Sequence, residues 1–187
     1  MQIPFKSCLE SGMDLTYKNL KEKHQKLIDA KWKLQDKLQE RASQLLREYS
    51  DSLALTSTEW TDSDGVKRPY VDIGVWEGKG NFSPILLPRL QMDGDYHLNF
   101  VIATTLDDSP LTGGGKHGVS VSIWYENASY YVSVGSGSDT TYLPVSPNPG
   151  GFYQVCGAIK ALINASLDRA MPCTPAPSSS APEDYEY

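Results

Sequence analysis

The residues able to carry chemistry are few and lie far apart along the chain. Three histidines and three cysteines could bind a metal or supply a nucleophile: His24, His97, His117, Cys8, Cys156 and Cys173. A zinc site needs such ligands at short, recognisable spacings, which are absent from this sequence. We therefore expect no metal and no cofactor. A nucleophilic pair of Cys156 and His97 stays open, but Cys156 falls on an apolar helical stripe, where a thiolate is disfavoured.

Two short motifs resemble parts of known binding loops but lack essential positions. Gly113-Gly114-Gly115-Lys116 resembles a phosphate-binding loop, which would also require Gly at 110 and Ser or Thr at 117. The chain has Pro110 and His117 there. Asp62-Ser63-Asp64-Gly65 resembles a fragment of a calcium loop without its downstream glutamate. We interpret the first motif as a loop and the second as a hairpin turn, so neither predicts an active site.

A two-residue alternation between Ser52 and Val134 carries the main functional hypothesis. In each predicted strand, one set of alternate residues is aliphatic, and the other set contains Trp and Tyr among small polar residues. A solvated sheet face more often carries Lys, Glu and Thr, whereas Trp and Tyr beside small polar groups are typical of recognition surfaces. We expect this second face to bind another protein. Its candidate binding residues are Trp60, Tyr70, Asp72, Trp76, His97, Asn99, Trp124 and Tyr131.

Two alternatives to this surface stay open. The long helix or a loop could cover the face, in which case its aromatic residues would be structural. A curved sheet could instead enclose a pocket for a small molecule or a substrate, lined by the same aromatic side chains with Asp72 as a polar group. Convergence of these side chains around Asp72 and His97 would favour the pocket, and a flat exposed patch would favour protein binding.

The elements that must position these residues follow from the change in hydrophobic period. Residues 14–50 show helical spacing with no Pro or Gly, and Asp14 is the expected N-cap. Residues 52–145 alternate with turn signals, which predicts an antiparallel sheet of about five strands. Asn148-Pro149 signals a helix start, so residues 149–170 should form a second helix that packs on the sheet. We therefore expect one α+β domain over 14–171, with a flexible segment at 1–13 and a disordered acidic tail at 172–187.

The first helix is longer than a small domain needs, about 54 Å. Leu20, Leu27 and Leu34 recur seven residues apart in its first half, and Leu38 and Leu45 continue the stripe. We expect the second half to pack on the sheet and the first half to meet a partner. A homodimer through this helix is one form of that partner, and a single amphipathic helix is the alternative.

Charge and composition limit the class of protein. The net charge is −6 with a pI near 5.0, which argues against nucleic acid as the partner. The helical segment 14–49 is locally basic, with nine Lys and Arg against six Asp and Glu. The sequence has no signal-like or membrane-spanning stretch, so we expect a cytoplasmic protein without a membrane partner.

The leading hypothesis is a non-enzymatic protein-interaction module, an adaptor, chaperone-like factor or inhibitor that acts through the aromatic sheet face and the long helix. A bacterial accessory protein would fit this type. The alternative is a small-molecule-binding or enzymatic α+β domain that uses the same face.

Overall fold

A six-stranded antiparallel sheet forms the body of the protein. The computed structural model describes residues 15–78 and 80–172. Across the sheet, the strands follow the order β4 (Asn81–Pro84), β3 (Val71–Glu77), β5 (Leu98–Thr105), β6 (Lys116–Glu126), β7 (Ser129–Val134) and β8 (Thr141–Val145). A separate two-stranded sheet pairs β1 (Glu59–Thr61) with β2 (Lys67–Pro69). The predicted α+β architecture is confirmed, with more strands than the five expected.

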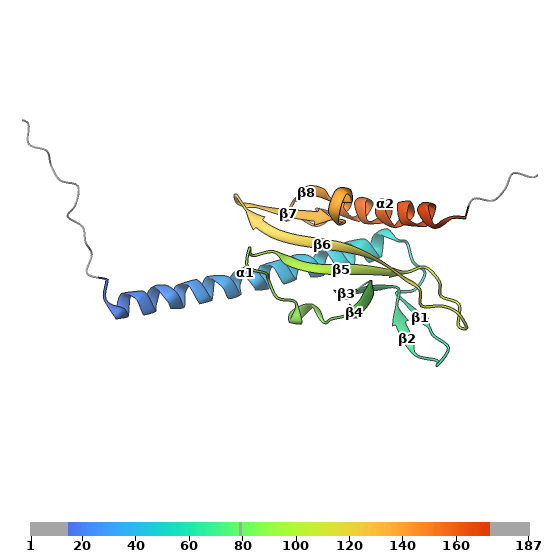
Figure 1. Ribbon diagram of the computed structural model, residues 1–187, viewed down its shortest axis with the longest axis horizontal. Coiled ribbons are helices and arrows are strands. Elements are labelled where there is room, and N and C mark those ends of the chain that lie inside the picture. The colour runs from blue at the N-terminus through green and yellow to red at the C-terminus, as the bar shows by residue number, and fades with distance from the viewer. Residues whose placement is uncertain (1–14, 79, 173–187) are drawn as a thin grey trace, which may run out of the picture.

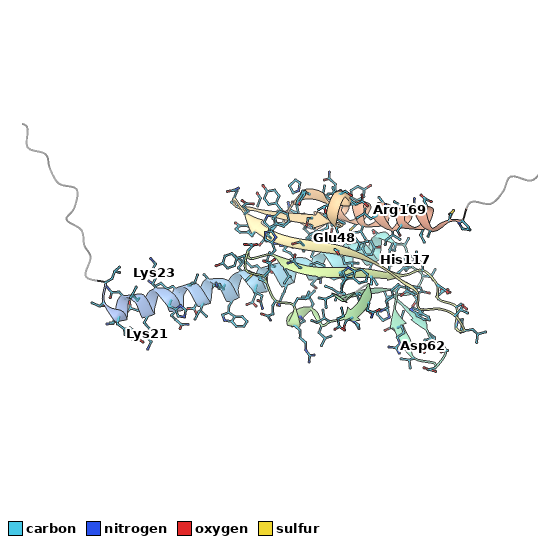
Figure 2. The ribbon with its side chains drawn as sticks, in the orientation of Figure 1. Lys21, Lys23, Glu48, Asp62, His117 and Arg169 are labelled. Carbon is cyan, nitrogen blue, oxygen red and sulfur yellow. The ribbon has the colours of Figure 1, made fainter. Side chains whose placement is uncertain are left out.

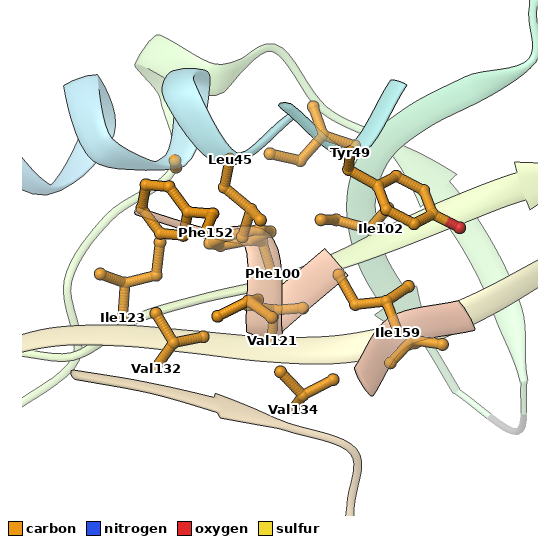
Figure 3. Close-up of a cluster of buried hydrophobic side chains, with 14 of the residues drawn as sticks. Leu45, Tyr49, Phe100, Ile102, Val121, Ile123, Val132, Val134, Phe152 and Ile159 are labelled. Carbon is orange, nitrogen blue, oxygen red and sulfur yellow. The ribbon is translucent and has the colours of Figure 1, made fainter. Parts of the chain in front are cut away.

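Helices α1 (Tyr17–Ser52) and α2 (Tyr153–Ala170) cover one face of the six-stranded sheet (Figure 1). Most of the alternate strand residues that point toward them are aliphatic or Phe, as the period of two requires. Figure 3 shows this core, in which Leu45 of α1 and Ile159 of α2 meet Phe100 and Val121 of the sheet. Neither helix within the described residues is long and apolar enough to cross a bilayer.

Helix α1 has a packed half and a projecting half. Leu38 and Leu45 are fully buried, whereas Leu20 and Leu27 are 51% and 47% exposed. The first turns extend beyond the sheet, with Lys21 and Lys23 far from the core (Figure 2). The apolar stripe is therefore continuous along the helix, but the described residues leave Leu20 and Leu27 about half exposed.

The ends of α1 differ slightly from the prediction. The helix runs over residues 17–52 rather than 14–50, and Thr16 caps it by accepting a hydrogen bond at Oγ1 from the backbone N–H of Asn19, at 3.3 Å. The expected cap, Asp14, lies outside the described residues, as do the predicted flexible segment and all of the predicted tail except Pro172.

A carboxylate of α1 joins the two helices. Glu48 accepts hydrogen bonds from the backbone N–H groups of Gly150 and Phe152, at 2.9 and 3.0 Å, just before α2 begins. Desolvation raises the pKa of Glu48, but hydrogen bonds from Gln44 and these two N–H groups outweigh it, so the pKa is lowered. Helix α2 starts at Tyr153, not at 149, because Gly150 has a φ of +81° and the chain turns there.

Within the alternating segment 52–145, residues 68–77 read as one predicted strand, but the structure divides them between two sheets. Tyr70 separates β2 from β3, and its backbone bonds to both sides: its N–H donates to Thr58, and its C=O accepts from Thr105. Residues 53–58, predicted as strand, follow α1 without forming one. As a result, β1 and β2 do not share the alternation of the main sheet.

Candidate functional site

The reverse face of the six-stranded sheet is free of both helices. We call it the open face, defined by Asp72, Gly74, Trp76, Asn99, Val101, Ser120, Ser122, Trp124, Tyr131, Ser133 and Tyr142. Trp76 is 40% and Tyr142 69% exposed. Trp76 and Trp124 share this face, opposite the layer that contains Val75 and Ile123, as the alternation predicted.

Four ring side chains form a row across β5 to β8 at one end of the open face. His97 stacks on Trp124 with 4.8 Å between ring centroids, and Trp124 stacks on Tyr131 at 5.8 Å. Tyr142 completes the row with its ring edge-on to Trp124, at 6.2 Å. We call these four residues the aromatic ladder. Direct cross-strand pairing of Trp124 with Tyr131 sets its register.

Beside the ladder lies a groove of about 450 Å³. Its floor includes Ser120 and Ser122 of β6 and Ser133 of β7, and Ser122 pairs directly with Ser133. Trp76 and Tyr142 are the two aromatic residues of the open face that line it. We call it the serine groove. The Ser122 hydroxyl is buried and has no hydrogen-bond partner among the described residues, so the floor holds one polar group that remains unsatisfied.

Two glycines let aromatic rings lie close to the sheet. A Cβ at Gly118 would lie 2.5 Å from Cη2 of Trp76, and a Cβ at Gly74 would lie 2.6 Å from Cε2 of Phe82. The Trp76 indole N–H donates to Ser120 Oγ at 3.1 Å, and Phe82 meets the Trp76 ring edge-on. Strand glycines often mark such close approaches, and here they fix the position of the Trp76 ring.

The serine groove has an uncharged lining. The residues lining it include no Asp, Glu, His, Lys or Arg. Asn99 of the lining donates a hydrogen bond from its side-chain amide to the carboxylate of Asp93 at 2.7 Å. The backbone N–H of His97, with help from Asn99 and Asp95, lowers the pKa of Asp93, so this carboxylate stays ionised and is unsuited to donate a proton.

Five of the eight predicted site residues come together on the open face: Trp76, His97, Asn99, Trp124 and Tyr131. Asp72 shares the face, but its carboxylate is paired with Lys116 Nζ at 2.7 Å. The aromatic residues therefore do not converge around Asp72 and His97, as the pocket alternative would require.

Trp60 and Tyr70 lie apart from this group, where they contact the loop at 106–115. Trp60 is buried in β1, with its ring 3.6 Å from the Cβ position of Gly114. The Tyr70 hydroxyl donates to Asp108 at 2.6 Å, and this bond raises the pKa of Tyr70. Their placement follows from the division of the predicted strand at Tyr70.

Tyr142, Phe82 and the two close-approach glycines were not predicted as site residues. Tyr142 could have been found by extending the alternation into residues 141–145, a segment predicted only as a short strand. The role of Gly118 has no sequence signal, because it depends on a Trp side chain from a strand more than forty residues away in sequence.

The structure does not bring Cys156 and His97 together as a nucleophilic pair. Cys156 is buried on α2 in the helix-covered layer, whereas His97 stacks in the ladder on the other face. Burial, with repulsion from Glu48, raises the pKa of the Cys156 thiol to about 11. Within residues 15–78 and 80–172, no group of three His, Cys, Asp or Glu side chains could hold a metal.

No protein-family model, curated protein or solved structure matches the chain.

Proposed function

We propose that this protein is a non-enzymatic protein-binding module that acts through the open face of its six-stranded sheet. The observation that carries the proposal is the aromatic ladder beside an uncharged serine groove, on a face that neither helix covers. Trp and Tyr contribute disproportionately to protein interfaces because they bury a large area with few rotatable bonds.

The stacking of the ladder supports this reading. Trp124 contacts a ring on each side and a third edge-on, so its rotamer is fixed before any partner arrives. Trp76 is fixed by its hydrogen bond to Ser120. A surface held in this way loses little side-chain entropy on binding, which favours recognition.

The spacing of the two indoles suits an extended chain. Trp76 contacts Ser120, four residues before Trp124 on β6, a separation of about 13 Å along the strand. Residues i and i+4 of an extended partner segment have the same separation. Such a segment could place one side chain against Trp76, another against the ladder, and small polar groups over the serine floor.

Binding by strand addition at the sheet edges is the less favoured mode. The edge strands are β4 and β8, which are short and contain Pro84 and Pro144 respectively. Proline has no N–H to donate and is a common device against edge pairing. The proposal therefore rests on the side chains of the face rather than on backbone pairing.

A small molecule in the serine groove is the second candidate. The groove volume of about 450 Å³ lies within the usual range for such ligands. This alternative predicts that Ser122 and Trp76 matter and that Trp124 does not, whereas protein binding requires both Trp76 and Trp124.

The direct test is comparative partner capture from the cells that naturally make the chain. The bait proteins are the wild type, Trp76→Ala/Trp124→Ala, and Trp32→Ala as a control that removes an exposed indole from α1. We expect the wild type and the control to retain one partner in common and the double variant to lose it. Equal capture by a correctly folded double variant would refute the proposal. Trp76→Ala and Trp124→Ala are also used singly, and loss with Trp76→Ala but not with Trp124→Ala would favour the groove ligand.

A further inference from the structure

A second concave site lies on the helix-covered side of the sheet, between α1 and the hairpin that joins β6 to β7. It is a cleft of about 610 Å³ that is lined by α1, by the hairpin and by residues at the end of β8. Tyr125 and Tyr130 alternate with the open-face residues of their strands, so this cleft and the serine groove belong to opposite faces. It is therefore independent of the proposed binding face.

Three cations of α1 line this cleft: Lys33, Lys37 and Arg41. Their spacing of four residues places them in one row along the helix. The lining includes no Asp or Glu, and none of the ion pairs among the described residues involves these three side chains. Like charges at this spacing repel each other, so an anion in the cleft would relieve an unfavourable interaction.

Arg41 and the two tyrosines form a fixed wall. Arg41 Nη1 donates to the backbone C=O of Pro147 at 2.8 Å and to Gln44 Oε1 at 2.7 Å, and the guanidinium lies 5.1 Å from the Tyr130 ring centroid. Tyr125 packs against Tyr130 with 4.9 Å between centroids and is itself 47% exposed. The wall thus combines a positioned cation with accessible aromatic surface, the side-chain types enriched at binding hot spots.

We infer that this cleft binds a short acidic segment of a partner protein. Carboxylates of the segment would lie along Lys33 and Lys37, and an apolar or aromatic side chain would pack on Tyr125. A short segment fits better than a nucleic acid, because the cleft offers only three cations and the chain carries a net charge of −6. A long polyanion would extend onto the acidic remainder of the protein and be repelled.

The inference can be tested with a fluorescein-labelled synthetic peptide in which glutamates flank a single tyrosine, by fluorescence anisotropy on the full-length protein. We expect saturable binding that weakens as salt is raised. In Lys33→Gln/Lys37→Gln the affinity should fall by about tenfold, as the loss of two moderate charge contacts implies. Both lysines are exposed, so this variant should unfold at the same urea concentration as the wild type.

The matched control is Lys18→Gln/Lys21→Gln, which removes the same charge from the projecting end of the same helix. We expect its affinity to stay within about twofold of wild type. Equal losses in the two variants would show that binding reflects net charge alone and would overturn the inference, as would the absence of any binding by the wild type.

Further measurements distinguish a partner protein segment from other occupants of the cleft. Tighter binding of a single-stranded oligonucleotide or an anionic vesicle than of the peptide, with the same dependence on Lys33 and Lys37, would overturn the assignment to a protein segment. The chain itself contains acidic residues at Glu183, Asp184 and Glu186. If neutralising those three strengthened peptide binding, the occupant would be this chain's own segment and not a partner.

Discussion

The two faces of the six-stranded sheet carry side chains of opposite character. The helix-covered face is aliphatic, and its residues Leu98, Ile102 and Ile123 are completely buried. The open face carries serines and aromatic rings, with Trp76 and Tyr142 substantially exposed. This difference indicates that stability is concentrated on one face, which leaves the side chains of the other available for recognition.

The largest difference between the faces should appear when one aromatic side chain is removed from each. Phe100→Ala opens a cavity under the helices and should reduce the free energy of unfolding by about 3–5 kcal/mol. Trp124→Ala removes stacking contacts from an accessible row and should cost no more than about 1–2 kcal/mol. Urea unfolding of both variants measures this, and similar losses would contradict the division between the faces.

Buried hydroxyl groups provide a second comparison. The Tyr49 hydroxyl and Thr104 Oγ1 lie 2.8 Å apart in the covered layer, so Thr104→Val leaves a buried phenol unpaired and should cost about 1–3 kcal/mol. Ser122 of the open face has no partner to lose, and its hydroxyl is buried and unsatisfied, so Ser122→Ala should leave stability unchanged or raise it by up to about 1 kcal/mol. A Ser122→Ala loss as large as that of Thr104→Val would show that the groove floor is a structural network.

A substitution at Glu48 tests how α1 and the start of α2 are joined over the covered face. Its pKa is lowered in the folded protein from 4.5, so it contributes stability that is fully present above that value and lost as the pH falls through the lower, folded pKa. Glu48→Gln should cost about 1–2 kcal/mol near neutral pH. The difference in unfolding free energy from wild type should shrink on acidification below pH 4.5. A gap that widens in acid would contradict this role, and exposed Glu40→Gln is the control.

The smallest expected effect concerns the close contact between Gly118 and the Trp76 ring. Gly118→Ala introduces a methyl group 2.5 Å from the indole and should displace it at a cost of about 1 kcal/mol. The indole N–H resonance of Trp76 should shift, since its hydrogen bond to Ser120 changes. Gly94→Ala, where the new methyl meets nothing within 4 Å, is the matched control. An unchanged Trp76 resonance in Gly118→Ala would contradict the described ring position.

The sequence predicted the elements of the fold because their periods are long and regular. The stripe of α1 continues from Leu20 and Leu27 through Leu34 to Leu38 and Leu45 at intervals of four and seven residues, so it identifies the helix and its apolar side. The stripe could not show where the sheet stops beneath it. Only the topology reveals that the described residues leave Leu20 and Leu27, in the first turns of α1, about half exposed.

The sequence also predicted part of the candidate site, because a regular two-residue alternation runs through the strands that carry it. Alternation places Trp76, Asn99 and Trp124 correctly on one face because they lie within uninterrupted strands of one sheet. It fails for Trp60, because the chain passes from one sheet to the other at Tyr70 and the alternation restarts. The serine groove also depends on long-range contacts, such as that of Trp76 with Gly118, which no local pattern contains.

The central claim is that a partner protein occupies the open face, and hydroxyl-radical footprinting of the captured complex tests it most directly. We expect oxidation of Trp76, Trp124 and Tyr142 to fall when the partner is bound, while the exposed Trp32 of α1 reacts as before. Protection of Trp32 together with unchanged oxidation of the two sheet indoles would place the partner on the helix and contradict the account.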